Sequence, residues 1–369
     1  MAADVQQVHG EMRGINPVIA QTVAAGTLQR ELGVNLQISQ LTLGRGNGVL
    51  CTSPTDRGRL QSSALLFYQI VTVAAAPRGP TIEWRQEMKS RQFGSPPRPV
   101  SEIGQGTWNI EHVATGTAVQ ALRRGIDLGM THIDTAEMYG SGKAEQLIAT
   151  AIDGRRREIF LVSKVLPSNA SRKGVVQACE ASLARLQTDR LDCYLLHWRG
   201  SYPLRETVAA FEQLIRDGKI LSWGVSNFDV DDLEEIYGLS SSYPPVCNQV
   251  LYHLEERAIE HSVIPWCSTH GMAVVAYSPF GSESGFPAPR SPGGRVLQQI
   301  ADVHGATPRQ VALRFLLRNP SVFAIPKAST PEHVADNAQA GALELSSAEL
   351  EKIDAAFPRG PRPRSLPMI

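Results

Sequence analysis

Four side chains that could act together in protonating a carbonyl oxygen lie where apolar stretches of this sequence end, or just beyond: Asp134, Tyr139, Lys164 and His197. A tyrosine phenol has an ordinary pKa of about 10, too high for an efficient acid at neutral pH. A neighbouring lysine ammonium would lower that pKa, and an aspartate paired with the lysine would hold the ammonium charged and in place. A nearby histidine could donate a hydrogen bond to the substrate oxygen. The set would then protonate a carbonyl oxygen while another group delivers hydride to its carbon.

Each of these four residues also has an ordinary structural explanation when it is taken alone. Asp134 could be a loop or helix-cap residue, and Lys164 a surface ion-pair partner. His197 could be a core histidine with satisfied hydrogen bonds, and Tyr139 a packed loop aromatic. The catalytic interpretation therefore depends on their joint placement at the ends of successive apolar runs.

Two other motifs fit dinucleotide chemistry only in part. The stretch "IGQGTWN" begins like a dinucleotide-binding fingerprint, but Asn109 stands where the third glycine is required. Tyr139 and Lys143 have the Y-x-x-x-K spacing of short-chain dehydrogenases, in which both residues lie on one helix. Here Gly-Ser-Gly separates them, and glycine disfavours a helix. Neither alternative is therefore supported.

Short apolar, β-branched runs alternate with helical patterns from Met88 to the end of the chain. The apolar runs are residues 103–108, 132–134, 159–164, 191–197, 221–227, 246–251, 273–277 and 322–327. Helical patterns occupy residues 172–187, residues 203–219 with Gly218 as a stop, and residues 306–317, which open with the capping box of Thr307 and Gln310. Eightfold strand–helix alternation is typical of an α/β protein with a (β/α)8 TIM barrel. A doubly wound open sheet is the alternative.

The residues at the ends of these runs favour the barrel. They are Thr107, Asp134, Lys164, His197, Ser226 with Asn227, Gln249, Tyr277 and Lys327. In a barrel the carboxyl ends of all strands open on one face, which is where such enzymes hold their active sites. Strands commonly end in polar loops, which explains any one of these residues more easily than the whole series.

Residues 88–369 resemble an aldo-keto reductase over essentially their whole length. The motifs that carry the resemblance are "GQGTW" (104–108), "HIDTAEMYGSGKAEQLI" (132–148), "LVSK" (161–164), "LDCYLLHW" (191–198), "GVSNF" (224–228), "NQVLYH" (248–253), "AYSPFG" (276–281) and "IPKAST" (325–330). In this family the Asp, Tyr, Lys and His of these motifs form a catalytic tetrad, which implies that role for Asp134, Tyr139, Lys164 and His197. The resemblance further implies reduction of small aldehydes or ketones to alcohols by hydride transfer, with the tyrosine as general acid.

The same resemblance implies that NADPH lies extended across the mouth of the barrel. Ser226, Asn227 and Gln249 match the positions that hold the nicotinamide carboxamide, and Tyr277 matches the ring that stacks on the nicotinamide. The other residues of the predicted cofactor site are Thr107, Trp108 and Asp134, the loop of Ser278, Pro279, Phe280 and Gly281 along the pyrophosphate, and Lys327, Ser329, Thr330, His333, Asp336 and Asn337.

The adenosine end of this site departs from the usual pattern. Thr330 followed by Pro331 predicts a helix N-terminus, which favours a phosphate, and Lys327 just before it could meet the 2′-phosphate of NADPH. The family usually has serine where this chain has Ala328, and often arginine where it has His333. Histidine does not reproduce the bidentate fork of arginine. We therefore expect a preference for NADPH that is shallower than usual, with NADH tolerated.

The substrate prediction rests on aromatic residues near the tetrad. Trp108, Trp198 and Phe280 would form an aromatic wall around the carbonyl group, with Tyr139 and His197 contacting the substrate. Such a pocket suits small or aromatic aldehydes and α-dicarbonyls such as methylglyoxal. The short tail "AAFPRGPRPRSLPMI" offers little material to close over bulky substrates such as steroids. Two alternatives stay open: an NADPH-binding sensor or regulatory barrel with little turnover, and a sugar or polyol dehydrogenase working towards oxidation.

Composition limits the classes of partner. The 36 basic residues balance the 36 acidic ones, so neither nucleic acid nor an acidic membrane surface is indicated. Five cysteines without a CxxC pair suit reduced thiols in the cytoplasm better than a disulfide framework or a metal site. The apolar run 64–76 is shorter than the roughly 20 residues that a membrane span needs, so we expect a soluble protein. The oligomeric state is not indicated.

Residues 1–87 have no counterpart in the resemblance and show no sustained helical or strand periodicity. We therefore expect two parts, an N-terminal extension of residues 1–87 and a barrel of residues 88–369. The extension could be an over-long assigned start, a disordered segment or a small regulatory module.

Overall fold

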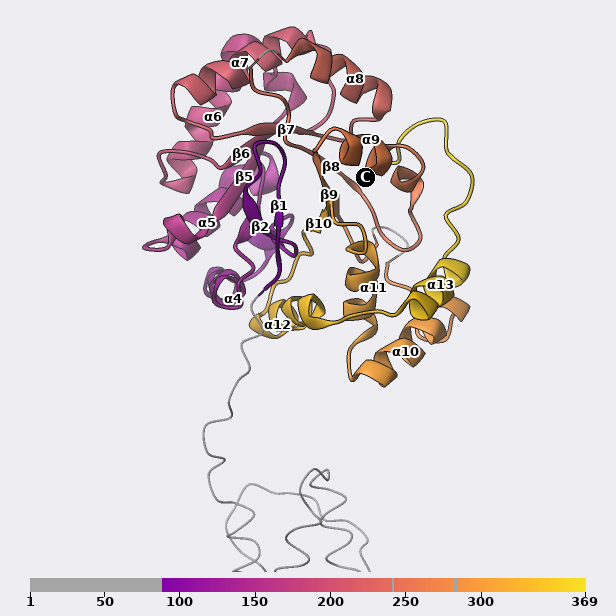
Figure 1. Cartoon of the computed structure of the whole chain (residues 1–369). Coiled ribbons are helices and arrows are strands. Elements are labelled where there is room, and N and C mark those ends of the chain that lie inside the picture. Colours follow the sequence, from indigo (N-terminus) through magenta and orange to yellow (C-terminus); the bar gives the residue numbers. More distant parts are fainter. Residues whose placement is uncertain (1–87, 241, 282–284) are drawn as a thin grey trace, which may run out of the picture. The chain divides into compact units, whose positions relative to one another are not determined.

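The computed structural model describes residues 88–240, 242–281 and 285–369 of the chain, and the predicted extension lies outside the described residues. Eight parallel strands form one sheet in chain order, with helices arranged around it (Figure 1). The strands of this sheet are β3 (Gln105–Gly106), β4 (His132–Asp134), β5 (Phe160–Val165), β6 (Cys193–Leu196), β7 (Trp223–Ser226), β8 (Cys247–Leu251), β9 (Ala273–Tyr277) and β10 (Val322–Ala324). Each of the eight predicted apolar runs overlaps one of them, and β5 extends one residue beyond its run.

The first and last strands of the sheet also bond to each other. Ile103 pairs in parallel with Ala324, and Gly106 pairs in parallel with Lys327. The backbone N–H of Gly104 donates to the carbonyl of Ala324 at 2.8 Å. A sheet whose edges bond in this way is a closed barrel. The (β/α)8 prediction is therefore confirmed, and the open-sheet alternative is wrong.

The helices form the outer layer of the barrel. They are α4 (Thr115–Asp127), α5 (Lys143–Ile152), α6 (Arg172–Leu186), α7 (Leu204–Arg216), α8 (Val230–Leu239), α9 (Val263–Thr269), α10 (Pro292–His304), α11 (Pro308–Leu316), α12 (Pro331–Gln339) and α13 (Ser347–Ala356). Short 3₁₀ helices are η1 (Ile110–His112), η2 (Tyr139–Gly142), η3 (Arg156–Glu158), η4 (Pro167–Asn169), η5 (Ala258–Glu260) and η6 (Ala340–Ala342). Among the described residues, no helix combines the length and apolar character that crossing a membrane requires.

Local signals in the sequence place several helix ends correctly. The Thr307 side chain and the Gln310 side chain form the predicted capping box at the start of α11. The Thr330 hydroxyl accepts a hydrogen bond from the backbone N–H of His333 and so caps α12. Helix α7 ends two residues before Gly218, whose φ of +71° suits glycine.

The two-residue periodicity of the strands decides which side chains enter the barrel. In β5, Phe160 and Val162 belong to the apolar cluster inside the barrel, whereas Leu161 and Val165 belong to the cluster under the helices. Lys164 continues the inward series of Phe160 and Val162 by two residues. The polar end of an inward series therefore comes to lie at the carboxyl end of the barrel.

A hairpin that the sequence analysis did not predict covers the amino end of the barrel. Strands β1 (Ser90–Gln92) and β2 (Pro99–Ser101) pair antiparallel. The ring of Phe93 lies 4.9 Å from the ring of Phe160 and 5.0 Å from that of Phe323, measured between centroids. This apolar plug closes the end of the barrel opposite to the polar strand ends.

Candidate active site

Lys164 is the centre of a buried hydrogen-bonded group. Its ammonium donates to Asp134 Oδ1 at 2.5 Å, to the carbonyl of Thr135 at 2.8 Å and to the hydroxyl of Tyr139 at 3.3 Å. These bonds use all three donors of the ammonium. The structure thus brings three members of the predicted tetrad into one group.

The turn η2 holds Tyr139 over Lys164. Gly140, Ser141 and Gly142 all have positive φ, at 54°, 54° and 89°. Helix α5 begins only at Lys143, after this left-handed turn. Tyr139 and Lys143 therefore do not share an α-helix, as the Y-x-x-x-K pair of a short-chain dehydrogenase would.

A buried glutamate in α5 connects this turn to the strand that carries Lys164. Glu145 accepts a hydrogen bond from the Ser163 hydroxyl at 2.7 Å and from Arg185 Nε at 2.5 Å. Ser163 directly precedes Lys164 and points out of the barrel. Because Glu145 lies in the first turn of α5, directly after η2, its carboxylate connects β5 to the turn that carries Tyr139. Glu145 was not among the predicted site residues. The signal in the sequence was Ser163 itself, because a polar side chain at an outward position of a buried strand needs a buried hydrogen-bond partner.

Burial and charge act in opposite directions on the pKa values of this group. Burial alone would lower the pKa of Lys164, but the carboxylate of Asp134 and the phenol of Tyr139 hold it above its ordinary value. Burial raises the pKa of Asp134, while Lys164 and Gln249 oppose that rise. For Tyr139, burial raises the pKa and outweighs the lowering by Lys164. The expectation of a net lowered tyrosine pKa was wrong, because it left out the desolvation of the phenol.

His197 lies beside the tyrosine at the end of β6. The centroid of its ring is 5.9 Å from that of Tyr139 and 4.9 Å from that of Trp198. Burial, and then the charge of Lys164, lower the pKa of His197 to about 3. Its Nδ1 atom is buried without a hydrogen-bond partner among the described residues. His197 is therefore a neutral imidazole at pH 7, with one N–H to donate.

The residues predicted to hold the nicotinamide carboxamide are bonded to the tetrad and to one another. Gln249 Nε2 donates to Asp134 Oδ2 at 2.7 Å, and the Ser226 hydroxyl donates to the carbonyl of Gln249 at 2.8 Å. The hydroxyl of Tyr277 donates to Asn227 Oδ1 at 2.9 Å. Amide and hydroxyl groups next to a half-buried aromatic ring form a donor and acceptor set that fits a nicotinamide carboxamide.

Two residues predicted at the mouth have different exposures. The hydroxyl of Thr107 donates to the backbone carbonyl of Asp134 at 2.8 Å, so this group is used within the protein. The neighbouring Trp108 exposes 48% of its surface and is free to contact a ligand. Trp198 is partly buried against His197.

The loop of residues 278–281, which is predicted to lie along the pyrophosphate (the strap), turns sharply after β9. Ser278 has a φ of 49°, and Gly281, with a φ of 93°, donates its N–H to the carbonyl of Ser278 at 2.9 Å. Pro279 between them is buried. The ring of Phe280 packs at 6.0 Å, between centroids, against Phe286, which lies beyond this loop in the chain, and among the described residues it has no ring contact with the tryptophans.

The basic side chains predicted to meet the 2′-phosphate at the adenosine end are open to solvent. Lys327 follows β10 and is exposed, and His333 is exposed in the first turn of α12. Ser329 and Thr330 lie between them and are partly exposed. This arrangement leaves the N-terminus of α12 accessible to a phosphate group.

Asp336 and Asn337 have different surroundings from those predicted. The carboxylate of Asp336 accepts hydrogen bonds from the Thr307 hydroxyl at 3.1 Å and from Gln310 Nε2 at 2.8 Å. Asn337 is 4% exposed. Both residues therefore contribute to the packing of α12, and the acceptors of Asp336 are already engaged with α11.

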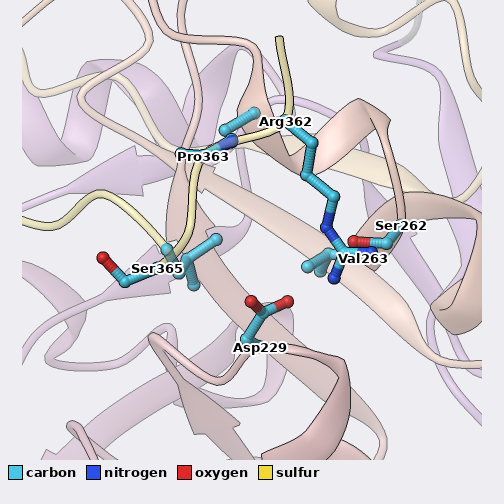
Figure 2. A pocket seen from close by; sticks show the side chains of 8 residues that line it. Asp229, Ser262, Val263, Arg362, Pro363 and Ser365 are labelled. Atoms are coloured by element: carbon cyan, nitrogen blue, oxygen red, sulfur yellow. The ribbon is translucent and has the colours of Figure 1, made fainter.

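The C-terminal tail reaches the mouth of the barrel, which the sequence analysis did not foresee. The carbonyl of Gly360 lies 3.1 Å from His261 Nε2. Beyond it, the tail forms one wall of a small pocket (Figure 2) lined by Asp229, Ala258, Ser262, Val263, Arg362, Pro363, Ser365 and Leu366. Burial raises the pKa of Tyr277 to about 12, and a hydrogen bond that its oxygen accepts from the backbone of the last residue, Ile369, opposes the rise. The chain thus ends at the ring predicted to stack on the nicotinamide.

Comparisons with known proteins agree with this architecture. The profile of the Aldo/keto reductase family matches residues 102–357. The chain is 47% identical over 269 residues to methylglyoxal reductase YeaE of Escherichia coli (strain K12), covering 72% of this chain and 94% of that protein. It is 33% identical over 253 residues to glyoxal reductase of Bacillus subtilis (strain 168), covering 69% and 87%.

A solved structure gives the same result. The chain superimposes with a TM-score of 0.72 and 43% identity on an aldo/keto reductase from Klebsiella pneumoniae in complex with NADP and acetate, covering 76% of this chain and 99% of that chain. A barrel with these polar strand ends, the family match and the structural match lead to one assignment. The chain belongs to the aldo/keto reductase family, and it is an NAD(P)H-dependent oxidoreductase of carbonyl groups.

Proposed function

We propose that this protein reduces small aldehydes and α-dicarbonyls, such as methylglyoxal, to alcohols with NADPH, and that Tyr139 is the proton donor. The observation that carries the proposal is the hydrogen bond between Lys164 and Tyr139 inside a buried group at the mouth of the barrel. The methylglyoxal and glyoxal reductases among the relatives support the substrate class. The Klebsiella pneumoniae enzyme in complex with NADP supports the cofactor.

Two features of Tyr139 bear on its role as a general acid. Its raised pKa keeps the phenol protonated before the reaction, but it also makes the phenol a weak acid unless the phenolate is stabilised as it forms. When the proton passes to the carbonyl oxygen of the substrate, the ammonium of Lys164 at 3.3 Å stabilises the phenolate that is left. Asp134 keeps that ammonium charged and fixed. Bound NADPH supplies the hydride that goes to the carbonyl carbon.

His197 acts on the same oxygen as a neutral hydrogen-bond donor. Because its imidazole is uncharged at pH 7, it orients the carbonyl without competing as an acid. Ser226, Asn227 and Gln249 would hold the carboxamide of the cofactor, and Tyr277 would stack on its ring. Trp108 and Trp198 would contact the substrate.

The test is NADPH oxidation with methylglyoxal and several simple aldehydes, comparing wild type with Tyr139→Phe. Tyr194→Phe is the matched control, because it also removes a buried hydroxyl, one without a hydrogen-bond partner among the described residues. Loss of a general acid lowers kcat by roughly 10²–10⁴-fold, so we expect that loss for Tyr139→Phe, with unchanged NADPH affinity. Tyr194→Phe should match wild type.

Two outcomes would contradict the proposal. Full activity of Tyr139→Phe would show that another group donates the proton. Tight NADPH binding by wild type without turnover of any aldehyde would favour the sensor or regulatory barrel.

We also infer a cytoplasmic location. The cysteines of the described residues, Cys179, Cys193, Cys247 and Cys267, are free and buried. Thiols in this state suit a reducing compartment. Fractionation of the native cells, followed by detection of this protein in each fraction, would test this inference.

A further inference from the structure

An arginine outside the predicted set of cofactor residues contacts two aromatic rings, one of which belongs to that set. The guanidinium carbon of Arg309, in the first turn of α11, lies 4.7 Å from the ring centroid of Phe280 and 4.8 Å from that of Phe286. Both rings are partly buried, whereas Arg309 is exposed. No carboxylate forms an ion pair with this guanidinium within residues 88–240, 242–281 and 285–369. Arg309 is thus an oriented cation with N–H groups available to a ligand.

The contacts around Arg309 locate it at the adenosine end of the expected cofactor groove. Phe280 belongs to the strap expected along the pyrophosphate. The residue that caps α11, Thr307, donates to Asp336 of α12 at 3.1 Å. The first turn of α12 directly follows the strand end that carries Lys327. Arg309 therefore lies between the strap and the helix whose N-terminus is expected to meet the 2′-phosphate.

The chemistry of this position matches a phosphate dianion. An arginine keeps its charge at every physiological pH and offers a planar fork of donors, which histidine does not. Contact with the rings of Phe280 and Phe286 restricts the guanidinium, so less conformational entropy is lost when a ligand binds. The family often has arginine where this chain has His333, so the permanent charge and donor fork of an arginine are missing at that position.

We propose that Arg309 binds the 2′-phosphate of NADPH together with Lys327 and thereby sets the preference for NADPH over NADH. The inference rests on the proposed function, because it assumes that the dinucleotide lies in this groove. It predicts a loss confined to ligands that carry a 2′-phosphate. A residue that only supported the strap would affect NADPH and NADH equally.

The experiment is calorimetric titration of wild type, Arg309→Met and Arg309→Lys with NADPH, NADH, adenosine 2′,5′-bisphosphate and AMP. Arg309→Met keeps the aliphatic stem over the rings and removes the charge. Arg216→Met is the matched control, because Arg216 is half exposed at the end of α7 that precedes the amino end of β7, away from the mouth. Binding does not require turnover, so the readout is independent of activity.

A charge-assisted hydrogen bond contributes enough free energy for a change of roughly 10–100-fold in affinity. We expect Arg309→Met to weaken the binding of NADPH and of adenosine 2′,5′-bisphosphate by that factor. The affinities for NADH and AMP should change by less than about 2-fold. The NADPH affinity of Arg309→Lys should lie between those of Arg309→Met and wild type. The salt dependence of NADPH binding should also become weaker in Arg309→Met.

Equal losses for NADPH and NADH would overturn the inference and assign Arg309 to support of the strap. Unchanged NADPH affinity would overturn it as well. Failure of wild type to bind either dinucleotide would overturn the proposed function itself, which separates the two failures.

Discussion

The ammonium of Lys164 and the carboxylate of Asp134 form an ion pair of 2.5 Å inside the barrel, where the two side chains are 0% and 2% exposed. Removing one partner of a buried pair leaves an uncompensated charge, whereas replacing both with apolar residues is often neutral or stabilising. Since Lys164 also bonds Tyr139, and Asp134 also bonds Gln249, the pair connects the predicted acid to the predicted cofactor site. Its contributions to stability and to activity can therefore be separated.

We expect Lys164→Met to abolish aldehyde reduction and to lower the free energy of unfolding by roughly 3–5 kcal/mol, because Asp134 is left buried and unpaired. The double variant Asp134→Leu with Lys164→Met should recover most of that stability but none of the activity. Urea unfolding and NADPH oxidation measure the two quantities. A single variant as stable as wild type would show that the pair is not buried as described.

His132 should make the protein sensitive to acid. It lies two residues before Asp134, in the apolar interior, and neither ring nitrogen has a hydrogen-bond partner among the described residues. Burial, and then the charge of Lys164, lower its pKa from 6.5 to about 3. Below pH 6.5 the unfolded chain binds a proton that the folded protein does not, so stability is present above that pH and is lost as the pH falls towards 3.

We therefore expect His132→Leu to gain stability relative to wild type by up to about 1.4 kcal/mol for each pH unit below 6. Unfolding curves at a series of pH values measure this difference. His112→Leu, at a histidine whose side chain is 74% exposed, is the control. Parallel pH dependences of wild type and His132→Leu would contradict the prediction.

The rate of reduction should not depend on titration of Tyr139 or His197 near neutral pH. The pKa of His197 is lowered to about 3, and that of Tyr139 lies above its ordinary value. Neither group changes its charge between about pH 5 and 9, so kcat should be flat over that range unless another group titrates. A limb in the profile that disappears in His197→Asn would contradict the assignment of a neutral imidazole.

His333→Arg should strengthen NADPH binding selectively. An arginine at this exposed position, in the first turn of α12, adds a bidentate donor for the 2′-phosphate. We expect NADPH to bind roughly 10-fold more tightly and NADH to be unchanged, which titration of both dinucleotides would measure. Equal affinity of wild type and variant for NADPH would mean that the phosphate lies elsewhere.

Features that depend on a few neighbouring residues could be read from the sequence. The short apolar, β-branched runs predict the strands, and their polar ends predict that Asp134 and Lys164 lie at the same end of the barrel. The capping box of Thr307 and Gln310 spans only three residues, so it is visible without any tertiary contact. The order of these elements, together with the family motifs, was sufficient to predict the fold. The same motifs named the four tetrad residues, which the structure brings close together.

Other properties depend on residues far apart in the chain. The net pKa of Tyr139 follows from how completely the fold removes the phenol from water, which motif spacing does not reveal. Asp336 is engaged by Thr307 across 29 residues, and Arg309 lies over Phe280 across a similar distance in sequence. Ile369 bonds Tyr277 because the tail returns to the mouth. The sequence by itself determined which side chains could do the chemistry, and only the tertiary structure decided their solvation and which of their polar groups remain available to a ligand.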